Sequence, residues 1–150
     1  MIGAQLIRPA REQDRGAWSA LWADYCTALD GVVTASATDG LWSAILDDGK
    51  PVGCLLAEGD AGTLEGFANY VLHPHTWSLR SVCYLEDLYV APSARGSGAA
   101  RALIAGLEEL GRRHDWRRVY WHAHETNYRA RALYDRITPR TSYVRYDIEL

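Results

Sequence analysis

The residues best suited to chemistry lie between Leu85 and Ala100, where two carboxylates precede an apolar strand and a turn that contains glycines. A carboxylate at Glu86 or Asp87 can accept a proton or attract a cation. Side chains alternate along a strand, so these neighbours are expected to face opposite sides of the sheet. We expect Glu86 to be the functional carboxylate, either as a base acting through water or as an anchor for a cationic substrate. Asp87 is expected to be structural.

The turn that follows reads Arg95-Gly96-Ser97-Gly98-Ala99-Ala100 and leads into a helix. The first N–H groups of a helix lack partners within the helix and lie at the positive end of its dipole, so a pyrophosphate fits there. The two glycines would let the backbone approach such an anion closely. Glycines also occur in such turns for conformational reasons alone. The dinucleotide-binding fingerprint fits poorly, because it requires a small residue where Arg101 stands.

Hydrophobic periodicity predicts the elements that must position these residues. The most regular pattern is a helix over 98–113, and Asp14 is expected to cap the first helix. The other expected helices cover 14–29, 39–47 and 127–136, and the expected strands cover 5–8, 52–57, 64–72, 82–90, 118–123 and 143–150. This order predicts an α/β domain with a mixed sheet, antiparallel in its middle and flanked by about four helices.

Composition restricts the class of protein. The chain has 150 residues and is 48% apolar, which suffices for one domain with a real core over 1–150. The three cysteines are odd in number and far apart, so buried thiols are expected in place of disulfides or a zinc site. The sequence contains no apolar run long enough for a membrane span, and Met1–Gln5 lacks a signal-peptide pattern. These features predict a cytoplasmic protein without a membrane partner.

Charge is distributed unevenly along the chain. The net charge of −3 argues against a nucleic-acid partner. Residues 1–94 carry 5 basic and 12 acidic side chains, whereas residues 95–150 carry 11 basic and 7 acidic ones. The basic part suits a polyanionic cofactor and the acidic part a cationic substrate, although single surface charges are usually only solvated.

Two motifs together resemble the GCN5-related N-acetyltransferase (GNAT) superfamily. Residues Arg95–Ala100 fit its Gln/Arg-x-x-Gly-x-Gly/Ala pattern and follow a strand that ends in Leu88-Tyr89-Val90. Residues Asn127–Tyr134 match its later Asn-x-x-Ala-x-x-Leu-Tyr pattern. The resemblance covers nearly the whole chain, although 137–142 replace the usual glycine and phenylalanine after the last helix. It implies a single GNAT-like domain that transfers an acetyl group from acetyl-CoA to a primary amine, without a metal.

The acceptor amine is not identified by these motifs. Residues 66–68 and 84–87 are similar to the diamine and polyamine acetyltransferases, and 143–146 are similar to the histone and polyamine branch. A polyamine, an amino acid, an aminoglycoside and a protein lysine all present a similar amine. The alternating residues 143–150 also predict an exposed strand that could pair with a second copy to form a homodimer.

The resemblance implies roles for individual residues. It places Tyr134 near the thioester sulfur. The chemistry of acetyl transfer asks for a base, an acid for the leaving thiolate and an oxyanion donor, and the candidates are Glu86 (a base or only an anchor), Tyr134 and the N–H of Val90. The residues that bind acetyl-CoA would be Leu88, Tyr89, Val90, Arg95, Gly96, Ser97, Gly98, Ala99, Ala100 and Asn127. The strand residues among them are also ordinary core residues, and Asn127 is also a good helix cap.

Other functions stay open from the sequence. A non-catalytic sensor that binds coenzyme A would keep the glycine turn but would not require Glu86 or Tyr134. A plain interaction module would require none of these residues. His122 and His124 have the spacing of a metal-binding pair on one strand face, but no third ligand is close in the sequence.

Overall fold

The computed structural model describes residues 5–150, so the expectation about the first four residues lies outside the described part. The main elements are β1 (Leu6–Pro9), α1 (Arg15–Ala28), α2 (Ala35–Leu46), β2 (Val52–Glu58), β3 (Leu64–Pro74), β4 (Ser81–Val90), α3 (Ala99–Arg113), β5 (Arg118–Tyr120) and α4 (Tyr128–Ile137). Three short 3-10 turns, η1 (Glu12–Asp14), η2 (Asp60–Gly62) and η3 (Pro92–Ala94), connect them. This arrangement confirms the expected α/β fold class.

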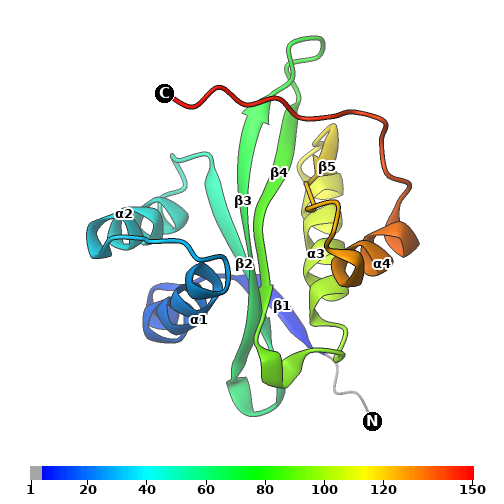
Figure 1. Cartoon of the computed structure of the whole chain (residues 1–150). Coiled ribbons are helices and arrows are strands. Elements are labelled where there is room, and N and C mark those ends of the chain that lie inside the picture. Colours follow the sequence, from blue (N-terminus) through cyan, green and yellow to red (C-terminus); the bar gives the residue numbers. More distant parts are fainter. Residues whose placement is uncertain (1–4) are drawn as a thin grey trace.

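The strands form one five-stranded sheet in the order β1-β2-β3-β4-β5. The first four strands pair antiparallel, whereas β5 pairs parallel to β4. Helices α1 and α2 lie on one side of this sheet, and α3 and α4 lie on the other (Figure 1). The sheet is therefore mixed and antiparallel in its middle, as predicted.

Each side of the sheet has its own hydrophobic core. On the α3 side, Leu103 and Leu107 are fully buried against Leu55 and Leu85. Gly106 lies against the sheet so closely that a Cβ there would come within 2.8 Å of the Ile7 side chain. A residue without a side chain at this position lets α3 sit directly on β1 and β2.

The other core is rich in aromatic side chains. The ring of Trp18 lies 4.8 Å from that of Trp42 and 5.7 Å from that of Trp22, and Tyr25 packs edge-on against Phe67. Edge-to-face and offset ring contacts of this kind stabilise packing beyond the area they bury. This core fixes α1 against β3 and β4, which matters because α1 contributes Tyr25 to the site described below.

The first helix begins differently from the prediction. Asp14 does not cap α1 with its side chain. Its carboxylate instead accepts two hydrogen bonds from the Arg8 guanidinium, at 2.7 and 2.9 Å, and one from the Arg11 N–H. Arg8 lowers the pKa of Asp14 by these bonds, and it also donates to Glu58 at 2.6 Å. Asp14, which was expected to cap α1, therefore binds the partly buried guanidinium of Arg8.

The expected terminal strand over 143–150 is wrong, since residues 138–150 form no helix or strand. The chain there runs across the end of β3 and β4 instead of along a strand edge, so its backbone has no ladder to join (Figure 1). The alternating residues Val144, Tyr146 and Ile148 are each at least 73% exposed. Two smaller differences are that α2 begins earlier, at a Thr34 cap, and that β5 ends at Tyr120.

The three cysteines are free thiols, as expected. Cys54 and Cys83 are buried, and Cys26 is half-buried. Burial raises the pKa of the Cys83 thiol to about 12, so it stays protonated and inert. Across residues 5–150, none of the helices combines the length and the apolar character that crossing a lipid bilayer requires.

Candidate active site

The outer backbone edge of β4 is open along its last residues. Parallel pairing with β5 covers only Val82–Tyr84, so no strand within residues 5–150 pairs with this edge farther along β4. On the inner edge, the Ala91 N–H donates to the Glu65 carbonyl at 2.8 Å. Because inward and outward groups alternate in an antiparallel ladder, the backbone groups of Val90 and Leu88 point away from β3. We call this stretch, Leu88–Val90, the open edge.

The side chains of the open edge are structural. Leu88 and Val90 pack against the core on the α3 side. Tyr89, the residue between them, has a buried side chain in the other core and a backbone that faces β3. Only the outward N–H and C=O groups of Leu88 and Val90 are therefore available to a ligand, which leaves Tyr89 a supporting role.

The turn after β4 presents a helix N-terminus. Gly96 and Gly98 have φ values of +85° and +93°, which L side chains rarely adopt, and Gly98 is the N-cap of α3. Gly98 itself has no side chain that could cap this helix. The N–H groups of Ala100 and Arg101 have no acceptor within residues 5–150, so they are free to bind an anion. A Cβ at either glycine would meet open space, which shows that backbone conformation, not crowding, requires them.

The turn is held in part by Gln5 and Glu65, two side chains that the sequence did not single out. Gln5 donates to the Ser97 hydroxyl at 2.6 Å and to the Glu65 carboxylate at 2.9 Å, and the Ser97 oxygen also accepts from the Ala99 N–H at 3.3 Å. Arg95 is exposed and reaches back to the Val90 carbonyl at 3.4 Å. Ser97 thus shapes the turn, while the guanidinium of Arg95 keeps free donors on the surface.

Helix α4 brings Tyr134 to the open-edge side of the sheet. Tyr134 packs against the same core as Leu88 and Val90, with its ring 5.5 Å from that of Trp121. Burial raises the pKa of the Tyr134 phenol, so it carries its proton at neutral pH. Asn127 is the N-cap of α4, where its side chain accepts from the Ala130 N–H at 3.3 Å. The structure therefore places Tyr134 on the same core as the side chains of the open edge and gives Asn127 the alternative role of a cap.

Glu86 stands at an irregularity in β4. The register shifts between Asn69 and Tyr70, so that Asn69 pairs with Asp87, Tyr70 pairs with Leu85, and Glu86 is the extra residue of a β-bulge. Its side chain is exposed. Partial burial raises the pKa of the Glu86 carboxyl, and so does the charge of Asp87. A base whose pKa is moved upward, towards neutrality, is better matched to proton transfer there.

Asp87, which the sequence analysis expected to be structural, faces α1. It accepts hydrogen bonds from the Tyr25 hydroxyl at 2.9 Å and from the Asn69 amide at 3.2 Å. Burial raises the pKa of Asp87, and these two bonds partly oppose the increase. Asn69 is only 2% exposed, yet its side-chain oxygen has no hydrogen-bond partner among residues 5–150. That oxygen would be satisfied by a water molecule or by an ammonium group.

Asn69 and Tyr25 were not predicted as site residues. The available signal for Asn69 was an amide inside the apolar run of β3, where a side chain of this kind needs a partner. Tyr25 carried no such signal, since it matches the apolar stripe of α1. We refer to Tyr25, Asn69, Tyr84, Glu86 and Asp87 as the polar cluster.

Aromatic and histidine side chains border the polar cluster. Tyr84 stacks on Tyr120 with ring centres 5.0 Å apart, and its hydroxyl lies 3.2 Å from Nδ1 of His122. His124 instead contacts the Thr126 hydroxyl at 2.8 Å. Residues 5–150 contain no group of three or more side chains that could hold a metal ion.

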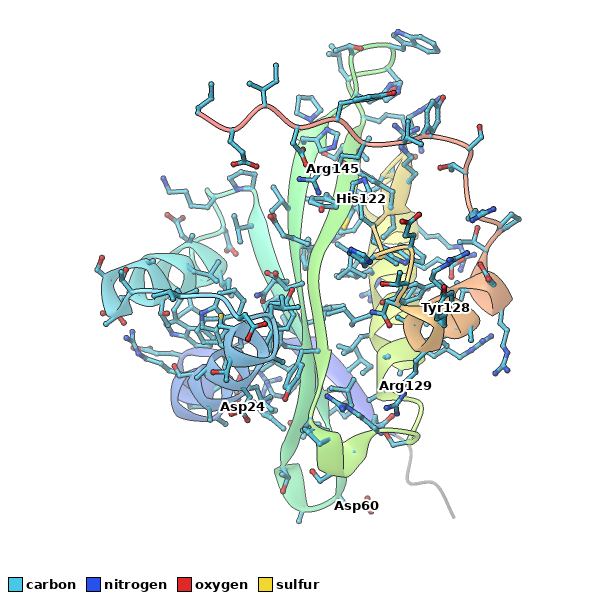
Figure 2. The ribbon with its side chains drawn as sticks, viewed as in Figure 1. Asp24, Asp60, His122, Tyr128, Arg129 and Arg145 are labelled. Carbon is cyan, nitrogen blue, oxygen red and sulfur yellow. The ribbon has the colours of Figure 1, made fainter. Side chains whose placement is uncertain are left out.

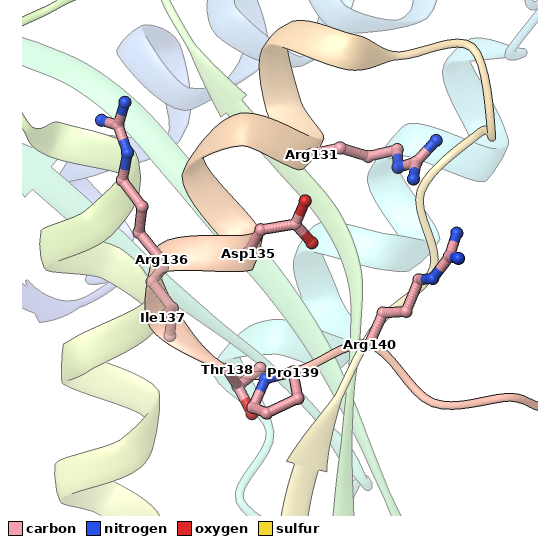
Figure 3. A pocket seen from close by; sticks show the side chains of 7 residues that line it. All are labelled: Arg131, Asp135, Arg136, Ile137, Thr138, Pro139 and Arg140. Carbon is pink, nitrogen blue, oxygen red and sulfur yellow. The ribbon is translucent and has the colours of Figure 1, made fainter.

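A surface hollow of about 620 Å³ lies elsewhere, between the end of α4 and the chain that follows it (Figure 3). It is lined by Arg131, Asp135, Arg136, Ile137, Thr138, Pro139 and Arg140. None of these residues was predicted as a site residue. A smaller hollow of about 290 Å³ borders the glycine turn and includes Arg95 and Ser97.

Comparison with known proteins agrees with this geometry. Residues 5–138 match the model of the acetyltransferase (GNAT) family. A D-amino-acid N-acetyltransferase, HPA3 of Saccharomyces cerevisiae, is 31% identical over 97% of this chain and 92% of its own length. An aminoglycoside N(6')-acetyltransferase type 1 of Klebsiella aerogenes is 29% identical over 75% of this chain and 74% of its own length.

A solved structure resembles the whole chain. The ribosomal-protein-alanine N-acetyltransferase of Brucella melitensis biovar Abortus 2308 superposes with a TM-score of 0.81 and 25% identity, over 98% of this chain and 100% of that one. The family model covers the open edge, the turn and α4, so all three are parts of the domain that this family shares. The chain is therefore a member of the acetyltransferase (GNAT) family.

Proposed function

We propose that the protein transfers the acetyl group of acetyl-CoA to the primary amine of a small molecule. The observation that carries this proposal is the open edge beside a helix N-terminus with free N–H groups. Outward groups of Leu88 and Val90 can bind the amide-rich pantetheine arm as a strand would be bound, while the turn at Gly96–Gly98 receives the pyrophosphate. Asn127 and Arg95 are further candidates for contact with the cofactor.

The reaction needs one proton removed and one supplied. The acceptor nitrogen attacks the thioester carbonyl carbon, and Glu86 takes the nitrogen's proton through a water molecule. The N–H of Val90 stabilises the negative oxygen that develops on that carbon. The carbon–sulfur bond then breaks, and Tyr134 gives its proton to the departing thiolate. The products are an N-acetylated amine and coenzyme A.

The relatives support a small acceptor. The name of the yeast relative specifies D-amino acids, and that of the Klebsiella relative specifies aminoglycosides. The polar cluster suits the amine of such a molecule, because Glu86 and Asp87 attract its positive charge before deprotonation. The exposed position of Glu86 at the bulge is also compatible with a protein lysine, which remains the broader alternative.

The decisive test is release of free thiol from acetyl-CoA with a panel of amines. We expect turnover with at least one small amine class. Glu86→Gln should then lower kcat by about 10²-fold near neutral pH, with partial recovery at high pH, where more of the amine is already deprotonated. An increase in KM with kcat unchanged would instead make Glu86 an anchor.

A sensor that only binds coenzyme A is the second candidate. Thermal stabilisation by acetyl-CoA without thiol release across the whole panel would favour it. The raised pKa of Glu86 argues for the enzyme, because a sensor has no need of a carboxylate with the properties of a base.

We also propose that the 150 residues form one cytoplasmic acetyltransferase domain and that two copies form a homodimer. The support for the homodimer is not a strand edge but the apolar side chains of the terminal segment 143–150, which stay exposed. Removal of residues 143–150 should convert a dimer to a monomer in analytical ultracentrifugation. A wild-type chain that sediments as a monomer would refute this part of the proposal.

A further inference from the structure

One cationic side chain overhangs the polar cluster and has no part in acetyl transfer as proposed. Figure 2 shows Arg145, on the chain that crosses the start of β4, in the same region of the molecule as His122. His122 contacts the Tyr84 hydroxyl, and Tyr84 is two residues from Glu86. The charge of Arg145 is felt at both Tyr84 and Glu86, where it opposes the increase in pKa that burial causes. The positive charge of Arg145 therefore acts on the place where the acceptor amine is expected.

The guanidinium of Arg145 is held by one hydrogen bond, and its other donors stay available. Its Nε donates to the Asp147 carboxylate at 2.8 Å, which fixes the plane of the group. Its two terminal nitrogens make no hydrogen bond within residues 5–150. Arg145 and Glu86 form no ion pair within 4.0 Å, although each lies in the field of the other. Because the two groups do not pair with each other, each can bind the opposite charge of one ligand.

From this placement we propose that the acceptor is a zwitterionic amino acid, with its ammonium group at Glu86 and its carboxylate on Arg145. The proposal rests on the proposed acetyl transfer and names the acceptor class of that site. The terminal nitrogens of a guanidinium form the two parallel hydrogen bonds that a carboxylate accepts best. The side-chain oxygen of Asn69 can accept a further bond from the ammonium group or from water.

The same charge disfavours the acceptor that the sequence suggested. A diamine or polyamine would place a second ammonium group near Arg145, and the two positive charges would repel each other. Decarboxylated amines lose the bond to Arg145 altogether. Arg145 is thus a specificity-determining residue that separates amino acids from simple amines and polyamines.

The test compares D- and L-phenylalanine with phenethylamine, and D- and L-alanine with ethylamine. We expect Arg145→Ala to lower kcat/KM for a reactive amino acid by about 10- to 100-fold, mainly through KM, because a charge-assisted bond is lost. The change in kcat/KM for the matching amine should be much smaller than that for the amino acid. Arg145→Lys should recover only part of the loss, because an ammonium group cannot form the paired bonds. Arg140→Ala, an arginine of the same segment, is the control and should leave the preference intact.

Calorimetric binding of the same ligands to the protein loaded with coenzyme A gives a readout that does not need turnover. Amino-acid binding that depends on Arg145 without any acetyl transfer would sustain the subsite and refute the proposed function. Spermidine or phenethylamine as the best substrate would sustain the function and overturn the subsite. An equal loss for amino acid and amine in Arg145→Ala, or a loss that follows Arg118→Ala instead, would also overturn it.

Discussion

The open edge binds through backbone groups, whereas the polar cluster is made of side chains. The open edge, with the turn that follows it, offers backbone groups from one continuous stretch, Leu88–Ala100. The polar cluster assembles side chains from α1, β3 and β4, and Arg145 overhangs it from the chain terminus. Backbone sites depend on local conformation, whereas side-chain sites depend on packing between distant segments. Substitutions should therefore act differently in the two regions.

The largest effect is expected in the turn. Gly98→Asp forces a side chain onto a residue with a φ of +93° and adds a negative charge where the pyrophosphate is proposed to bind. Acetyl-CoA affinity measured by calorimetry should fall by at least about 10²-fold, on the scale at which a few kcal/mol decide binding. Gly98→Ala separates the conformational part from the charge. Unchanged affinity in folded Gly98→Asp would remove the phosphate site from this turn.

The next effect separates binding from chemistry. Tyr134→Phe keeps the ring packed against Trp121 but removes the hydroxyl, so acetyl-CoA affinity should hardly change while kcat falls by about 10²–10⁴-fold. Steady-state kinetics and calorimetry on the same sample check both parts. Tyr128→Phe, an exposed tyrosine of the same helix, is the matched control and should behave as wild type. Wild-type kcat in Tyr134→Phe would exclude this residue as the acid.

The smallest effect is expected at Asp87 of the polar cluster and concerns stability as well as rate. Because burial raises the pKa of Asp87 in the folded state, its ionisation opposes folding as pH rises above the ordinary value of an aspartate. Asp87→Asn should therefore stabilise the protein at pH 7 by about 1 kcal/mol, with the gain vanishing in acid. The Asn69 amide can turn its unpaired oxygen towards the new NH₂ group.

The same substitution should also move the pH profile. The charge of Asp87 helps to raise the pKa of Glu86, so the acid limb of kcat/KM should shift to lower pH in Asp87→Asn. Thermal unfolding at pH 4 and pH 7 and a pH–rate profile measure the two effects. Asp24→Asn, an exposed carboxylate of α1 that Figure 2 marks, serves as the control and should change neither. A lower melting temperature at pH 7 would show that Asp87 is held for stability.

Much of this molecule was determined by its sequence. The α3 helix, the antiparallel strands β2 to β4 and the glycine turn follow from periodicity and from the conformations that glycine permits, which are local properties. For the same reason, the open edge and its turn could be located from consecutive residues.

Only the tertiary structure decided the rest. The bulge at Glu86, the bonds from Tyr25 and Asn69 to Asp87, and the position of Arg145 arise from contacts between segments 18 to 62 residues apart, or from the course of the terminal chain. The alternating pattern of 143–150 shows that those residues suit a strand, but a strand also needs an edge to pair with. Within residues 5–150 the terminal chain crosses the sheet instead of joining it, because pairing is a property of two segments and no single segment encodes it.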